Sequence, residues 1–145
     1  MTNTEDLRNL RCTKKLYDSI IREVCEKYAL GRPELDVLAF LHANAGMDVA
    51  SDIVEYCILS KANVSQAVER LIRRQLLVRV VDPEDRRRIH LNMTALAAPI
   101  IEDFDRAYDR FRNVLVAGLT GDELALYREL SRRMADNAMR YLENK

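Results

Sequence analysis

Apolar residues recur at steps of three and four positions along most of this chain, a spacing typical of amphipathic helices. The pattern predicts six helices, over residues 4–28, 33–44, 49–57, 60–74, 94–117 and 120–142. A side-chain oxygen of Ser, Thr or Asp can accept hydrogen bonds from the unpaired amides of a first helical turn. The expected N-caps are Thr4, Asp48, Ser60 and Thr120. We expect Gly31 to end the first helix, and Pro99 either to delay or to bend the fifth.

Between residues 76 and 93 the period of the pattern changes from helical to alternating. Segment 76–81 (LLVRVV) is rich in β-branched residues, and in segment 88–93 the apolar Ile89, Leu91 and Met93 alternate with polar positions. The intervening DPEDRR is typical of a turn, so the pattern predicts a two-stranded hairpin with a charged tip. Because a bare two-stranded ribbon is marginally stable in water, we expect it to pack against the helices.

Length and composition agree with one domain spanning residues 1–145. The chain has 48% hydrophobic residues, enough for a sizeable core, and only four Gly and three Pro, which is too few for a fold with many turns. The predicted fold class is therefore mainly α with a small β-ribbon.

The formal net charge is zero, but the charges are unevenly distributed. Residues 60–92 carry 8 basic and 4 acidic side chains, whereas residues 1–59 carry 7 and 10, and residues 93–145 carry 8 and 9. The positive excess thus lies entirely in the fourth helix and the hairpin, where we expect a polyanion to bind.

Other classes of function find little support in the sequence. No apolar stretch is long enough for a membrane span or a signal peptide. An odd number of cysteines without a CxxC pair favours a reducing cytoplasm over a disulfide framework; they are Cys12, Cys25 and Cys57. The two histidines, His42 and His90, stand apart, so we expect no metal site. No spacing suggests a catalytic triad or a phosphate-binding loop, so we expect neither an enzyme nor a cofactor.

Short helices followed by a β-ribbon are typical of a winged helix-turn-helix, in which one helix lies in the major groove of DNA and the ribbon tip reaches the minor groove. Basic, amide and hydroxyl side chains of the fourth helix can contact phosphates or base edges. The candidate DNA contacts there are Ser60, Lys61, Asn63, Ser65, Gln66, Arg70 and Arg73. At the ribbon tip, Arg86, Arg87 and Arg88 suit the negative potential of a narrow minor groove. Glu69 is instead expected to pair with Arg73 at i+4.

Residues 59–94, LSKANVSQAVERLIRRQLLVRVVDPEDRRRIHLNMT, resemble without a gap the recognition helix and wing of the MarR family of bacterial transcriptional regulators. The most specific part is DPEDRRRIHLNMT, which follows the family pattern of Asp, any residue, Arg, a strand and Leu-Thr, with Met93 in place of Leu. The resemblance implies that Asp85 braces the wing while Arg87 enters the minor groove. Gln75 stands where a C-capping Gly is usual, so we expect a different helix end there; Ile58 likewise replaces a turn glycine.

The resemblance also implies an organisation and partners. Residues 1–30 and 95–145 would form N- and C-terminal dimerisation helices, and residues 33–94 the DNA-binding lobe, with its wing at about 78–93. The apolar residues of both terminal helices support a homodimer, which would bind a roughly palindromic operator in double-stranded DNA. A small aromatic effector would bind between the dimerisation helices and the lobe. No metal or other cofactor is implied.

The function expected from these observations is sequence-specific, ligand-responsive DNA binding, most often repression, by a cytoplasmic homodimer. The alternative is a dimeric winged-helix adaptor without DNA binding, which the zero net charge favours and the basic helix and wing oppose. A separate alternative concerns Cys12, which lies where peroxide-sensing relatives carry a reactive cysteine and has basic neighbours. Its spacing to Tyr17 does not reproduce the sensor motif, and we expect an unreactive thiol.

Overall fold

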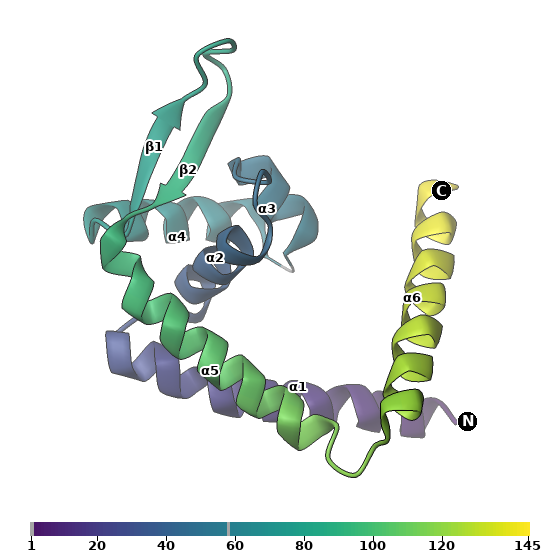
Figure 1. Cartoon of the computed structure of the whole chain (residues 1–145). Coiled ribbons are helices and arrows are strands. Elements are labelled where there is room, and N and C mark those ends of the chain that lie inside the picture. Colours follow the sequence, from purple (N-terminus) through teal and green to yellow (C-terminus); the bar gives the residue numbers. More distant parts are fainter. Residues whose placement is uncertain (1, 58) are drawn as a thin grey trace. The chain divides into compact units, whose positions relative to one another are not determined.

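The computed structural model describes residues 2–57 and 59–145. The described elements are α1 (Asn3–Tyr28), α2 (Arg32–Ala43), α3 (Ala50–Tyr56), α4 (Lys61–Arg73), β1 (Leu77–Val81), β2 (Ile89–Met93), a 3-10 turn (Ala95–Ala97), α5 (Ala98–Leu115) and α6 (Gly121–Glu143) (Figure 1). Along the sequence, the chain divides into two compact units between Phe111 and Arg112. The predicted class, mainly α with a two-stranded ribbon, is confirmed.

Two predicted N-caps are confirmed, at the helix that carries the candidate contacts and at the last helix. Ser60 Oγ accepts from the Asn63 amide at 3.1 Å. Thr120 and Glu123 form a reciprocal capping box, in which each side chain accepts from the other residue's backbone amide.

The ends of the first helix differ from the expectation. Thr2, rather than Thr4, caps α1, because Glu5 three residues later can reach back to the Thr2 amide at 2.9 Å. The helix ends at Tyr28, and its C-cap is Ala29, which has a left-handed backbone with φ +50° and lies two residues before Gly31.

The start of α3 also differs from the expectation. Its N-cap is Val49, not Asp48. The Asp48 side chain is turned toward β2, where it contacts His90. Ile58, the residue in place of a turn glycine, lies outside the described residues.

The C-terminus of α4 shows how a helix can end without glycine. Gln75 has φ +61°, the left-handed conformation that glycine adopts most easily. Its amide donates to Ile72 O and the Leu76 amide donates to Leu71 O, both at 2.9 Å, which is the Schellman pattern. The prediction of a different geometry was therefore wrong: the family's usual geometry is kept and Gln adopts it.

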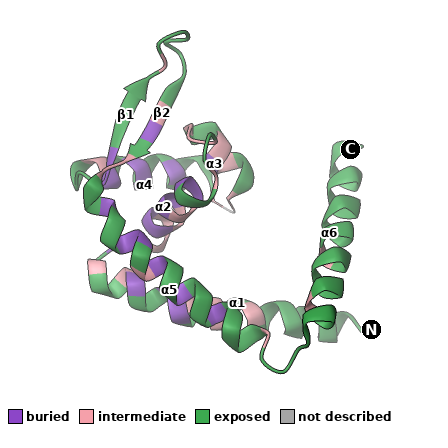
Figure 2. Cartoon of the chain, in the orientation of Figure 1, coloured by how far each residue is buried: buried purple, intermediate pink, exposed green. Residues whose placement is uncertain are grey.

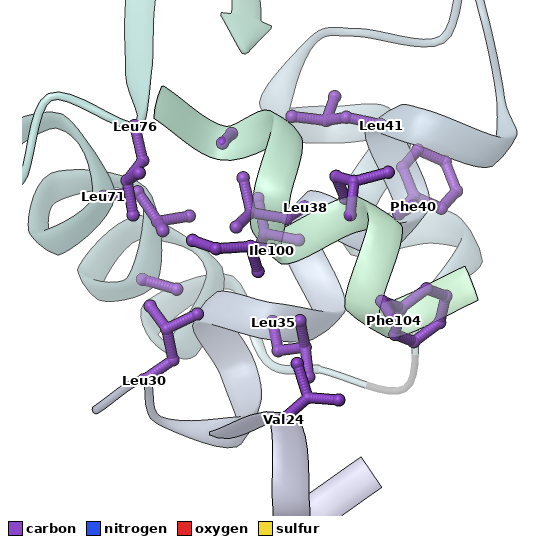
Figure 3. Packing of buried hydrophobic residues seen from close by; sticks show 14 of the residues in the cluster. Val24, Leu30, Leu35, Leu38, Phe40, Leu41, Leu71, Leu76, Ile100 and Phe104 are labelled. Atoms are coloured by element: carbon purple, nitrogen blue, oxygen red, sulfur yellow. The ribbon is translucent and has the colours of Figure 1, made fainter. Parts of the chain in front are cut away.

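One hydrophobic core joins α1, α2, α4, α5 and the base of the hairpin. Figure 3 shows Leu38 of α2 near Ile100 of α5, and Leu35 near Val24 of α1; Leu71 of α4 belongs to the same cluster. Leu35, Leu38 and Leu71 are fully shielded from solvent. The core therefore fixes the inner face of α4 and leaves its opposite face to solvent.

The hairpin is antiparallel, and its register pairs Leu77 with Met93 and Val80 with His90. Its base is held by Thr94, whose Oγ1 donates to Gln75 O at 2.6 Å. The Leu91 amide donates to Asp48 O at 2.8 Å, so the segment before α3 lies along the free edge of β2. The hairpin packs against the helices as expected, and its tip projects beyond the helices of its unit (Figure 1).

The segment after the hairpin begins with the 3-10 turn, and α5 starts only at Ala98. This late start is one of the two outcomes expected from Pro99. In the second unit, α6 buries none of its residues (Figure 2).

Candidate nucleic-acid interface

The recognition helix α4 has one buried and one exposed face. Val64, Ala67, Val68 and Leu71 face the core and are at most 4% exposed. All seven candidate contacts from the sequence lie on the remaining surface and are exposed: Ser60, Lys61, Asn63, Ser65, Gln66, Arg70 and Arg73. The helix therefore presents donors, acceptors and positive charge on a rigid element, as readout of a major groove requires.

The wing tip is a turn organised by two aspartates. Asp82 Oδ1 accepts from the amides of Glu84 and Asp85, at 2.8 and 3.0 Å. Asp85 Oδ1 in turn accepts from the Arg87 amide at 3.0 Å, and its carbonyl accepts from the Arg88 amide. The Asp85 carboxylate thus contacts the wing backbone, which is the type of contact that bracing requires.

The three wing arginines, Arg86, Arg87 and Arg88, are exposed, and none forms an ion pair with any described residue. An ordinary solvated turn would be expected to pair them with the neighbouring carboxylates. The carboxylates of Asp82 and Asp85 instead accept bonds from backbone amides, and Asp82 also contacts His90. The guanidinium groups are consequently available to an external anion.

Two charged residues of α4 have intramolecular partners. Glu69 pairs with Arg79 of β1, not with Arg73 as the i+4 spacing suggested, since the hairpin strand brings a closer guanidinium. Arg70 lies 3.6 Å from the carboxylate of Glu34 on α2. Arg73 has no ion pair among the described residues and is left free on the exposed face.

Sequence reasoning missed a second group of polar residues behind the wing. His90 Nδ1 lies 2.6 Å from Asp48 Oδ1, and His90 Nε2 lies 2.7 Å from Asp82 Oδ2. Both aspartates raise the pKa of His90 above its ordinary value. The bond from His90 and the bonds from two amides lower the pKa of Asp82 to about 2. The one available signal was that His90 falls on the polar side of the alternating strand.

Arg74 is a further residue that the sequence did not single out. Its guanidinium donates to Tyr28 O at 2.7 Å and to Ala29 O at 2.9 Å. These are the last carbonyl groups of α1, which helical bonds leave unsatisfied. Arg74 therefore fastens the C-terminal end of the recognition helix to α1.

Other kinds of site were sought among residues 2–57 and 59–145. No group of three or more His, Cys, Asp or Glu that could hold a metal ion occurs there. No described helix is long and apolar enough to cross a membrane. Burial raises the pKa of the Cys25 and Cys57 thiols, whereas Cys12 is exposed.

Comparison with known proteins agrees with this geometry. Residues 30–88 match the sequence model of the MarR family, a range that contains α2, α3, α4 and the wing tip. The chain is 25% identical over 127 residues to YwaE, an HTH-type transcriptional regulator of Bacillus subtilis strain 168. This match covers 88% of this chain and 74% of that protein.

Solved structures extend the likeness beyond the DNA-binding lobe. PcaV, a transcriptional regulator of Streptomyces coelicolor in complex with its natural ligand, is 29% identical. It has a TM-score of 0.69, with 95% of this chain and 94% of PcaV covered. MepR of S. aureus in complex with DNA shares the fold at 22% identity, with a TM-score of 0.72 and coverage of 94% and 98%. Residues 30–88 thus match the MarR family, and the chain has the winged helix-turn-helix fold of the regulators that it resembles, in agreement with the motifs of the recognition helix and wing.

Proposed function

We propose that this chain is a transcriptional regulator that binds operator DNA as a homodimer and responds to a small aromatic ligand, most often as a repressor in the cytoplasm. The observation that carries the proposal is the set of exposed, unpaired arginines at the wing tip, Arg86, Arg87 and Arg88, together with the polar exposed face of α4. A helix in the major groove and guanidinium groups in the adjacent minor groove would use both surfaces at once.

Exposed apolar residues on the terminal helices support the homodimer. On α6, Leu130 is 45% exposed and Met134 is 69% exposed, and on α1 Leu7 and Leu10 are 58% and 70% exposed. Such residues at helical spacing are typical of a helix that packs against another polypeptide. A two-fold dimer would set its recognition helices about 34 Å apart, one turn of DNA, and so favours a palindromic operator.

A hollow in the first unit supports the ligand. It has a volume of about 570 Å³ and is lined by α1, α2 and the segment after α3: Lys14, Tyr17, Arg32, Asp36, Ala39, Phe40, Cys57 and Leu59. Its two aromatic rings suit a small aromatic molecule, and an anionic group on that molecule would compete with Asp18 and Asp36, which pair with Lys14 and Arg32. The resemblance implies an effector between the dimerisation helices and the lobe; of these, α1 and α2 line this hollow, and α5 contributes no residue to it. PcaV, with a natural ligand bound, is a precedent for such regulation in a related protein.

The test is fluorescence anisotropy with DNA from upstream of this protein's own gene against scrambled DNA, across a salt series. We expect specific binding. The logarithm of the association constant should fall linearly with the logarithm of the salt concentration, with a slope of about −0.9 per neutralised phosphate. Arg87→Ala should weaken binding about 10-fold or more. Arg128→Ala, which removes an exposed arginine from α6, is the matched control and should leave affinity unchanged.

The competing function is a dimeric adaptor without DNA binding. A folded dimer that binds neither DNA at low salt would refute the regulator and leave the adaptor as the working model. Equal and weak binding to both DNAs would show a basic surface without sequence specificity, which contradicts operator recognition at that site.

A further inference from the structure

His90 occupies a position between the wing tip and the helix-turn-helix. Its imidazole is 23% exposed and lies between two carboxylates from different parts of the fold. Asp48 comes from the segment before α3, and Asp82 from the end of β1. Among the described residues, these two carboxylates are the charges that act on the ring, and its cross-strand neighbour Val80 is uncharged.

The distances fix the protonation state that this arrangement needs. Both ring nitrogens lie within 2.7 Å of a carboxylate oxygen, and an ionised carboxylate can only accept a hydrogen bond. Both nitrogens must therefore carry a proton, which makes the ring an imidazolium. A neutral ring has one N–H, and its other nitrogen would place a lone pair against a carboxylate, so one of the two contacts would break.

Each aspartate holds a different part of the interface. Asp82 Oδ1 organises the turn that carries the wing arginines through the amides of Glu84 and Asp85. Asp48 belongs to the helix-turn-helix, because α3 begins two residues later, and its carbonyl accepts a separate bond from the Leu91 amide of β2. The imidazolium of His90 is consequently a bridge from the turn of the wing to the helix-turn-helix.

We propose that His90 is a positioning residue for DNA binding: its two bonds, to Asp48 and Asp82, hold the wing and its arginines at a fixed place relative to α4. This proposal rests on the proposed function for its effect on DNA. It extends that function by a residue that touches no DNA itself. It also makes one of the links between the wing turn and the helix-turn-helix depend on a single proton, in addition to the backbone bonds at the base of the hairpin.

The dependence on pH has a definite sign. A histidine whose pKa is raised in the folded state keeps its bonds below its ordinary pKa and loses them as the pH rises through the raised value. The wing should therefore be held at acidic pH and loosen as the pH rises through the raised pKa of His90. DNA affinity should fall in the same direction, because a mobile wing must be ordered again when it binds.

The experiment measures operator affinity and NMR spectra of the full-length protein between about pH 6 and pH 9, a range that starts near the ordinary histidine pKa. His90→Gln removes the titrating group but keeps a polar side chain. Asp48→Asn removes one of the two charges that favour the imidazolium. His42→Gln makes the same change at the other histidine, which lies on α2 and contacts Asp105.

For wild type and His42→Gln we expect a loss of affinity of about 3- to 10-fold as the pH rises. His90→Gln should bind more weakly in acid and show no such loss, and Asp48→Asn should move the midpoint to lower pH. The His90 ring resonances should titrate above the ordinary pKa. In the same range, the heteronuclear NOE of the Arg87 amide should decrease.

The proposal would be overturned if DNA affinity depended on pH in the same way in wild type and in His90→Gln. It would also be overturned if the heteronuclear NOE of the Arg87 amide were the same whether the His90 ring is charged or neutral. Circular dichroism shows whether each variant is folded. A wild type that binds no DNA at any pH would refute the proposed function, while the Arg87 NOE would still decide whether His90 holds the wing.

Discussion

Arg70 Nη1 of the recognition helix lies 3.6 Å from Glu34 Oε1 in the first turn of α2. Glu34 is only 7% exposed, and its Oε2 has no hydrogen-bond partner among the described residues. A buried carboxylate is costly unless a cation compensates it, and Arg70, whose side chain is 57% exposed, supplies that cation. The same guanidinium is a candidate DNA contact, so DNA phosphates and Glu34 compete for it.

Removing Arg70 should therefore have two effects. Arg70→Ala should weaken DNA binding and also lower the free energy of unfolding by about 1–3 kcal/mol, because Glu34 stays buried without a compensating charge. Urea denaturation measures the second effect. Arg73→Ala, on the same helix but without an ion pair, should weaken DNA binding alone.

A second substitution separates the two roles of Arg70. In the double variant Glu34→Gln with Arg70→Ala, the buried charge is gone, so most of the lost stability should return while DNA binding stays weak. Equal unfolding free energies for Arg70→Ala and Arg73→Ala would contradict a stabilising role of the Glu34 contact.

Gln75 offers a test of backbone strain at the end of α4. A non-glycine residue with φ +61° is strained, and glycine adopts this conformation without cost. Gln75→Gly should raise the free energy of unfolding by about 0.5–1 kcal/mol, measured by thermal or urea denaturation. Gln66→Gly, in the helical interior of α4, should instead lower it by about 1 kcal/mol. A loss of stability in both variants would refute the strain at Gln75.

Much of the fold could be predicted because local patterns determine it. The helical periodicity located every described helix, and the change to alternation located the hairpin, since burial on one face imposes these periods. Ser60 and Thr120 were found as N-caps because they act on amides three residues away. Thr4 was wrong as a cap because Thr2 has a reciprocal partner at Glu5 and Thr4 has none.

The contacts that join distant segments could not be predicted. His90 meets Asp48 across 42 residues, and Arg70 meets Glu34 across 36, so no spacing in the sequence indicates either pair. Local spacing also misled at Glu69, where the predicted partner on α4 was replaced by Arg79 from the neighbouring strand. The candidate contacts are exposed as predicted, and their roles on DNA remain predictions until tested.

Asp103 of α5 should make the protein sensitive to acid. Lys27 Nζ lies 2.6 Å from Asp103 Oδ2 and Tyr28 Oη lies 2.5 Å from it, and Arg106 pairs with the other oxygen. These groups hold the pKa of Asp103 well below its ordinary value of 3.8. A carboxyl with a lowered pKa stabilises the fold above its ordinary pKa, and this contribution is lost as the pH falls below it.

Asp103→Asn should accordingly lower the urea midpoint at neutral pH, and the difference from wild type should shrink below about pH 4. Asp109→Asn, also on α5 and exposed, has no ion pair among the described residues and should match wild type at every pH. If the urea midpoints of Asp103→Asn and wild type differed by the same amount at every pH, the contact would act through packing alone and not through the carboxylate charge.

The apolar face of α6 should hold the dimer together. Leu126, Leu130 and Met134 follow one another at four-residue steps and are 45–69% exposed in the single chain. A charge at the centre of this face would be buried without a partner in a dimer, so Leu130→Glu should weaken association about 10-fold or more. Light scattering with size-exclusion chromatography across a concentration series measures this change.

The control for that experiment is Arg128→Glu, because position 128 lies on the opposite face of α6 and should keep the dimer. If the two recognition helices must bind two half-sites together, Leu130→Glu should also bind operator DNA more weakly at protein concentrations where it is monomeric. A Leu130→Glu protein that remains as dimeric as wild type would place the dimer interface elsewhere. One that is monomeric yet binds the operator at full strength would show that a single lobe suffices, and the palindromic operator would then lose its physical basis.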